Sequence, residues 1–159
     1  MYVKKVTKGS FNLTKIKFLK EIWKASRPLS LTLAFYSTTL GMAIAHLEEK
    51  LLSDSLSYDL KLIFLVTLAG LFVQTGTNFI NDYFECEYKN IHFDTGEKYS
   101  FLGKKRKAFD ILIFILGIIS FLITALLGLY IISITTRKLI LIGVLGIIGG
   151  YAYTGEPIV

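Results

Sequence analysis

Four long stretches of the chain carry no formally charged side chain, and segments that contain charged residues separate them. The stretches are residues 29–47, 62–81, 111–136 and 139–155. An α-helix needs about 17–25 mainly apolar residues to cross the hydrocarbon core of a bilayer. Because backbone amides cannot stay unpaired in lipid, such stretches are expected to be helical. The pattern predicts an all-α, multi-pass transmembrane helical bundle with about four spans in this chain.

The alternative class is a soluble bundle of four buried helices, which would need a polar face on each helix. The stretch 111–136 in particular lacks such a face. The composition agrees with a membrane protein, since 53% of the 159 residues are hydrophobic and the mean hydropathy is +0.56. A single cysteine excludes a disulfide framework and a cysteine-rich metal site. We therefore expect the protein in the cell membrane, in contact with lipid.

Residues 1–28 form a basic leader ahead of the membrane part, residues 29–159. No small-residue cleavage site follows the first apolar stretch, so the leader does not resemble a signal peptide. Within it, lysines fill much of one helical face, which is typical of an amphipathic helix on a membrane surface. A solvated basic tail is the alternative. The apolar residues of the other face are Leu13, Ile16, Leu19 and either Ile22 or Trp23.

The basic residues also predict an orientation. Of the 18 lysines and arginines, fourteen lie in the leader or between the second and third stretches. The two other connections hold two each. Because loops rich in Lys and Arg stay on the cytoplasmic side, both termini are predicted to be cytoplasmic. The second stretch then ends at the cytoplasmic face of the membrane.

Amide and carboxylate side chains gather at that end. Asn78, Asn81, Asp82 and Glu85 follow one another at three- and four-residue spacing, which places them on one face of a helix. Mg²⁺ takes oxygen ligands, typically one or two carboxylates with phosphate oxygens of a substrate. The cluster therefore favours a site where Mg²⁺ and nearby basic residues hold a diphosphate. A polar, solvated helix end is the alternative.

Three stretches resemble the UbiA superfamily of intramembrane prenyltransferases, most closely its menaquinone branch. The first is WKASRPLSLTLAF at 23–35 with LGMAIA at 40–45. The second is NFINDYFE at 78–85 followed by Asp94, and the third is GGYAYTGEPI at 149–158. Their order and spacing are similar to those of the family across nearly the whole chain.

The resemblance implies one half of a nine-helix bundle that transfers a prenyl group from a polyprenyl diphosphate to an aromatic acceptor. The menaquinone branch favours 1,4-dihydroxy-2-naphthoate as that acceptor, and 4-hydroxybenzoate or another ring is the alternative. Two acidic motifs of the family bind Mg²⁺ and the diphosphate. Arg27 matches an arginine implied to meet the acceptor or the diphosphate. The remaining implied site residues are Asn78, Asn81, Asp82, Glu85 and Asp94 for the metal and diphosphate, and Tyr151, Tyr153 and Thr154 for the pocket.

The chain departs from the family pattern in three places. Glu85 stands where an aspartate is usual, Asp94 lies about three residues late, and the second acidic motif is absent. We therefore expect a fragment or truncated copy, or a chain completed by a second polypeptide, and no catalytic residue is assigned. The alternatives are a non-catalytic or split-enzyme membrane subunit and a small transport component. An ion path would place charges deep inside the spans, whereas the charges of this chain lie near the span ends. The basic run at 104–107 flanks a span, so it is read as a membrane anchor and not as a nucleic-acid site.

Overall fold

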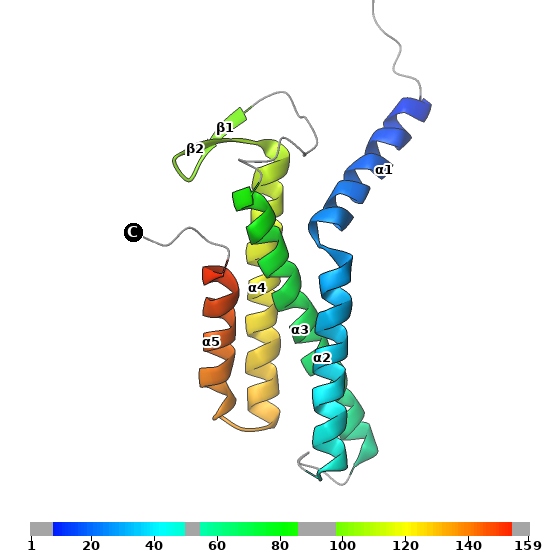
Figure 1. The fold of residues 1–159 in the computed structure, drawn as a ribbon, viewed down its shortest axis with the longest axis vertical. Helices are drawn as coiled ribbons and strands as arrows, with labels where there is room; N and C mark the ends of the chain where they lie inside the picture. The colour runs from blue at the N-terminus through cyan, green and yellow to red at the C-terminus, as the bar shows by residue number, and fades with distance from the viewer. Residues whose placement is uncertain (1–7, 50–54, 86–97, 154–159) are drawn as a thin grey trace, which may run out of the picture.

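The computed structural model describes residues 8–49, 55–85 and 98–153, with side chains described from residue 16 onward. Five helices and one short β-hairpin make up this part of the chain (Figure 1). The elements are α1 Lys8–Ala25, α2 Pro28–Leu47, α3 Leu56–Glu85, β1 Lys98–Phe101, β2 Lys104–Lys107, α4 Ala108–Ile134 and α5 Leu139–Ala152. The predicted all-α membrane bundle is confirmed.

Three of the helices, α2, α3 and α4, are long and apolar enough to cross a membrane. The fourth predicted span, 139–155, corresponds to α5, which has 14 residues in the described part of the chain. At 1.5 Å per residue α5 is about 21 Å long, less than the hydrocarbon core. Residues 154 and 155 of that prediction lie outside the described residues.

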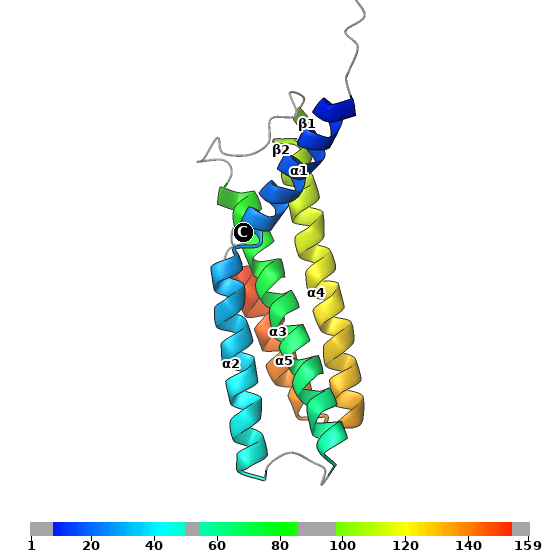
Figure 2. The ribbon, with the colours of Figure 1, turned by 90° about the vertical axis from the view of Figure 1, so that its right-hand side faces the viewer.

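Helices α2 to α5 run alternately up and down, and α1 leads into α2 in nearly the same direction (Figures 1 and 2). The core lies at one end of the bundle, where the end of α1, the end of α3 and the start of α4 meet. Its buried members are Ala25, Phe79, Phe109 and Ile113, with Phe18 and Ile22 of α1 packed against them. This core fixes α1 against the membrane helices.

Of the apolar residues predicted to line one face of α1, Ile22 packs inward and the others with described side chains do not. Ile16, Leu19 and Trp23 are all more than 60% exposed, whereas Phe18 and Ile22 contact the core. Leu13 lies outside the residues with described side chains. α1 lies nearly in line with α2 and reaches past the ends of α3 and α4 (Figures 1 and 2). The contact of its exposed apolar side chains with a membrane surface stays a prediction.

Close packing of α3 on α4 depends on two glycines that face each other. A Cβ atom built at Gly76 would lie 3.2 Å from the carbonyl oxygen of Gly117. One built at Gly117 would lie 2.9 Å from Cδ1 of Ile80. Small residues at a crossing let two membrane helices approach closely and gain van der Waals contact. The α3–α4 pair is the frame on which the polar end of the bundle is built.

At the opposite end, polar contacts join the helix ends. His46 Nδ1 lies 3.0 Å from Oδ2 of the buried Asp59, which connects the end of α2 to the start of α3. Tyr58 donates a hydrogen bond of 2.6 Å to the carbonyl of Ile134, at the end of α4. These contacts show why α3 begins before the charge-free stretch: Asp59 is helical and has a partner.

Candidate functional site

The site is built around a sharp corner between α1 and α2. Pro28 disfavours the helical conformation for the residue before it, so α1 ends and α2 restarts with proline as its first residue. Arg27 between them has φ 51° and ψ 72°, a left-handed conformation that costs about 1–2 kcal/mol for a residue with a Cβ. The corner therefore needs contacts that hold it in place.

Asn78 of α3 supplies those contacts. Its side chain is buried, and its amide nitrogen donates to the carbonyl of Ser26 at 2.7 Å and to Oγ of Ser30 at 2.6 Å. Its amide oxygen accepts a hydrogen bond of 3.2 Å from Gln74. The amide nitrogen thus fastens the corner to α3. The amide oxygen keeps a second lone pair, so the predicted metal or diphosphate role of Asn78 stays a prediction.

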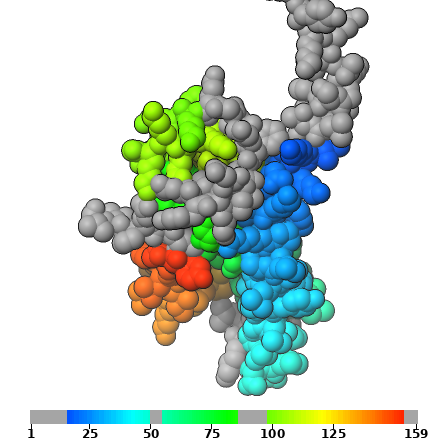
Figure 3. All heavy atoms as spheres, turned by 45° about the horizontal axis from the view of Figure 1, so that its top comes forward, coloured from blue at the N-terminus to red at the C-terminus, as the bar shows by residue number. Residues whose placement is uncertain are grey.

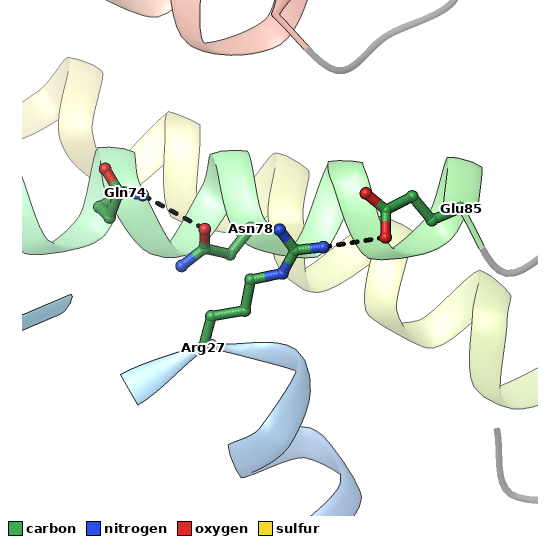
Figure 4. A network of polar contacts seen from close by, with 4 residues as sticks. All are labelled: Arg27, Gln74, Asn78 and Glu85. Atoms are coloured by element: carbon green, nitrogen blue, oxygen red, sulfur yellow. Dashed lines mark hydrogen bonds and ion pairs between the residues drawn. The ribbon is translucent and has the colours of Figure 1, made fainter. Parts of the chain in front are cut away.

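Glu85 makes the second contact between α3 and the corner. Its Oε2 atom lies 3.1 Å from Nη2 of Arg27. Figure 4 shows the arginine side chain extending from the corner toward α3, with its guanidinium group between Asn78 and Glu85. The two side chains are 39% and 38% exposed, so the ion pair is open to solvent and to a ligand. The structure thus brings Arg27 and Glu85, 58 residues apart in sequence, into one site.

Asn81 and Asp82 lie on the same helix between these two contacts, and both are half-buried. With Glu85 they present one amide and two carboxylates in the last two turns of α3. No group of three or more His, Cys, Asp or Glu side chains that could hold a metal occurs among the described residues. Two carboxylates and an amide still fit Mg²⁺, because this ion keeps water or phosphate oxygens in its remaining positions.

The other predicted site residues are in or beyond the end of α5, or in the segment that follows α3. α5 approaches α3 at Gly150, where a built Cβ atom would lie 2.8 Å from Oγ1 of Thr77. Tyr151 next to it is half-buried, whereas Tyr153 is 84% exposed. Asp94 and Thr154 lie outside the described residues. The end of α5 therefore reaches the level of the site, and no contact between its tyrosines and Arg27 or Glu85 is found in the described part.

An apolar groove of about 310 Å³ lies beside the corner. Residues of α1, α2 and α3 line it, and Arg27 is not among them. The lining residues are Trp23, Pro28, Leu31, Thr32, Phe35, Tyr36 and Leu71. Trp23 and Pro28 place the groove near the corner, on an apolar surface.

Sequence reasoning missed Arg106, a buried cation near the site. Its guanidinium carbon lies 4.8 Å from the ring centroid of Tyr83, which follows Asp82 in α3. Arg106 is 4% exposed, whereas a basic run is usually solvated. The turn residues Leu102 and Gly103, between KYSF and KKRK, are the signal for the hairpin that positions it.

The chain is similar to a known prenyltransferase. It is 32% identical over 143 residues to 1,4-dihydroxy-2-naphthoate octaprenyltransferase of Bacillus subtilis (strain 168). The match covers 86% of this chain, and the chain spans 42% of that protein's length. No family model and no solved structure gives a significant match. The match confirms the predicted resemblance to UbiA-type prenyltransferases.

Proposed function

We propose, from the chain's homology to a UbiA-type prenyltransferase, that this membrane protein carries the N-terminal half of an intramembrane prenyltransferase. It would bind a polyprenyl diphosphate through Mg²⁺ and pass the prenyl group to an aromatic acceptor. By analogy with the homologue that acceptor is 1,4-dihydroxy-2-naphthoate, which places the reaction in menaquinone synthesis. The observation that carries the proposal is the Arg27–Glu85 pair, which holds a guanidinium group over the amide and carboxylates of α3.

In the reaction, the bond between the allylic carbon and the diphosphate oxygen breaks, and the electron pair leaves with the diphosphate. A ring carbon of the acceptor then forms a bond to the allylic carbon. The ring recovers its aromaticity by losing a proton or, where the attacking carbon carries the carboxylate of 1,4-dihydroxy-2-naphthoate, by losing CO2. Bound Mg²⁺ would neutralise the charge that develops on the leaving group. Asn81, Asp82 and Glu85 would hold the metal, and Arg27 would donate hydrogen bonds to the phosphate oxygens.

The groove beside the corner would take the prenyl chain. Its lining is mainly apolar and includes Trp23 and Pro28, on the two sides of the corner. An apolar surface that excludes water would protect an allylic cation from hydrolysis. Asp94, Tyr151, Tyr153 and Thr154 remain proposed contributors to the same site. Because the chain spans 42% of its relative, a second acidic motif would have to come from another polypeptide or from further sequence.

Replacing Arg27 with glutamine is expected to weaken binding of farnesyl diphosphate by roughly 10- to 100-fold, since a hydrogen bond to a charged group contributes about 1.5–3 kcal/mol. The measurement is a calorimetric titration of the probe into the detergent-solubilised protein with Mg²⁺. Arg137→Gln removes the same charge from the connection between α4 and α5, at the other end of the bundle. Equal affinities of the two variants would contradict the proposed role of Arg27.

We also propose that the end of the bundle with the corner faces the cytoplasm, with both termini on that side. In a protein whose Cys86 is changed to serine, a cysteine at position 105 is then expected to react with an impermeant maleimide only after the cells are permeabilised. A cysteine at position 137 is expected to react in intact cells. The reverse pattern of labelling would invert the orientation.

A split enzyme or a non-catalytic membrane subunit is the second candidate for a chain that spans 42% of its relative's length. In either case the diphosphate site on α3 would be retained while prenyl transfer requires a partner. Transfer by the purified chain alone would exclude this candidate. Binding of the diphosphate without prenyl transfer would support it if a co-purifying polypeptide then restored the transfer.

A further inference from the structure

The β-hairpin between α3 and α4 has two different faces. Its register pairs Tyr99 with Arg106 and Phe101 with Lys104. Because side chains opposite each other in an antiparallel pair share a face, these four residues lie on one side. The other face carries Lys98, Ser100, Lys105 and Lys107, which pair with one another across the strands. We call this second set the lysine face.

The first face is fastened to the helices. The Phe101 ring lies 6.2 Å from that of Tyr83 and 5.4 Å from that of Phe114, measured between centroids. Arg106 stacks on Tyr83 from the same face. At the end of the hairpin, the backbone N–H of Lys107 donates to the Asp110 carboxylate at 3.3 Å, which fixes the start of α4. The hairpin therefore has a defined orientation on α3 and α4, with the lysine face directed away from them.

The lysine face carries a concentrated positive charge. It holds three of the five basic side chains of residues 98–107, and this segment has no acidic side chain. Lys98, Ser100 and Lys105 are exposed, and Lys107 is half-buried. Figure 1 shows the hairpin projecting sideways from the ends of α3 and α4, and Figure 3 shows it at the edge of this end of the molecule.

The hairpin also lies at the depth of the lipid headgroups. α3 has 30 residues and is about 45 Å long, so its ends extend past the hydrocarbon core of about 30 Å. Tyr83, which the hairpin packs against, is in the last turn of α3. The hairpin further exposes Tyr99 and Leu102, by 49% and 64%, and tyrosine is enriched in this interfacial layer.

We propose that the lysine face binds the phosphate groups of anionic lipids in the membrane that α2, α3 and α4 span. The charge complementarity and the depth of the hairpin carry this assignment. Each lysine near an anionic surface contributes about 1 kcal/mol, roughly a fivefold preference. This contact is independent of prenyl transfer and of the site on α3, so it stands or falls separately from the proposed function.

The test uses tryptophan fluorescence, because the chain has a single tryptophan. Trp23→Phe combined with Tyr99→Trp places the one reporter on the hairpin. The protein is reconstituted in phosphatidylcholine vesicles that contain equal fractions of either brominated phosphatidylglycerol or brominated phosphatidylcholine. We expect at least about fivefold stronger quenching by the anionic brominated lipid. Circular dichroism checks that each variant is folded.

Adding K98Q, K105Q and K107Q is expected to remove the difference between the two brominated lipids. The matched control is K17Q, K20Q and K24Q, which changes the net charge equally on α1 and should retain the difference. Equal quenching by both lipids in the reporter protein, or an equal loss in the control, would overturn the proposal. The proposal would also be overturned if inorganic pyrophosphate removed the preference for the anionic lipid while sodium chloride of equal ionic strength did not. The lysine face would then be a diphosphate site.

Discussion

Replacing Gly76 with leucine is expected to lower the free energy of unfolding by about 3 kcal/mol, because overpacking costs roughly 1–3 kcal/mol and occasionally more. The first added carbon alone would lie 3.2 Å from both the Gly117 carbonyl oxygen and the Phe121 ring. A backbone atom cannot move aside as a side-chain end can. The remaining carbons would therefore force α3 and α4 apart over the buried core.

The loss of stability is measured as the shift in the SDS-induced unfolding transition of the protein in mixed detergent micelles, followed by circular dichroism. Gly128→Leu is the matched control, since nothing lies within 4 Å of a Cβ atom built at Gly128 of α4. This substitution is expected to be neutral or to stabilise the helix by up to about 1 kcal/mol, since glycine is a weak helix former. Equal destabilisation by both substitutions would show that Gly76 does not set the spacing of the two helices.

Replacing Asn78 with leucine is expected to cost about 2 kcal/mol of stability. Leucine has a similar shape but donates nothing to the carbonyl of Ser26 or to Oγ of Ser30, which lie 2.7 and 2.6 Å from the amide nitrogen. Hydrogen bonds between membrane helices contribute about 0.6–2 kcal/mol each. The released corner would no longer hold Arg27 in its left-handed conformation, so binding of farnesyl diphosphate should weaken as well.

Asn81→Leu provides the comparison, because Asn81 is a half-buried amide in the next turn of the same helix. Its loss should reduce Mg²⁺-dependent binding of the diphosphate while changing the unfolding transition by less than about 1 kcal/mol. The two substitutions are thus distinguished by what each one lowers. Asn78→Leu lowers the stability, whereas Asn81→Leu lowers the Mg²⁺-dependent binding. If Asn78→Leu left the transition in place and removed only metal dependence, Asn78 would be a metal ligand after all.

Much of the fold follows from the pattern of charge along the chain. The predicted starts at residues 29 and 139 agree with α2 and α5 to within one residue. α3 is longer at both ends than its charge-free stretch, 62–81, since Asp59 pairs with His46 and Glu85 pairs with Arg27. A charge pattern marks where lipid contact ends, and a helix continues for as long as its polar side chains have partners.

The sequence predicts which residues of α3 share a face, and their contacts with other helices lie beyond it. Helical spacing correctly placed Asn78 and Glu85 on one face of α3, as their common contact with the corner shows. Spacing within one helix cannot reveal that Asn78 faces the Ser26 carbonyl, because that contact depends on how α1 and α2 pack. The burial of Arg106 was hidden for the same reason, since it depends on the hairpin folding back onto Tyr83.

The central claim is that Arg27 and the end of α3 form a Mg²⁺-dependent site for a prenyl diphosphate. Its most direct test is a titration of farnesyl diphosphate into the purified native protein, in the presence of Mg²⁺ and in the presence of EDTA. We predict binding with Mg²⁺ that is lost with EDTA. Equal binding under both conditions, or no binding under either, would contradict the claim.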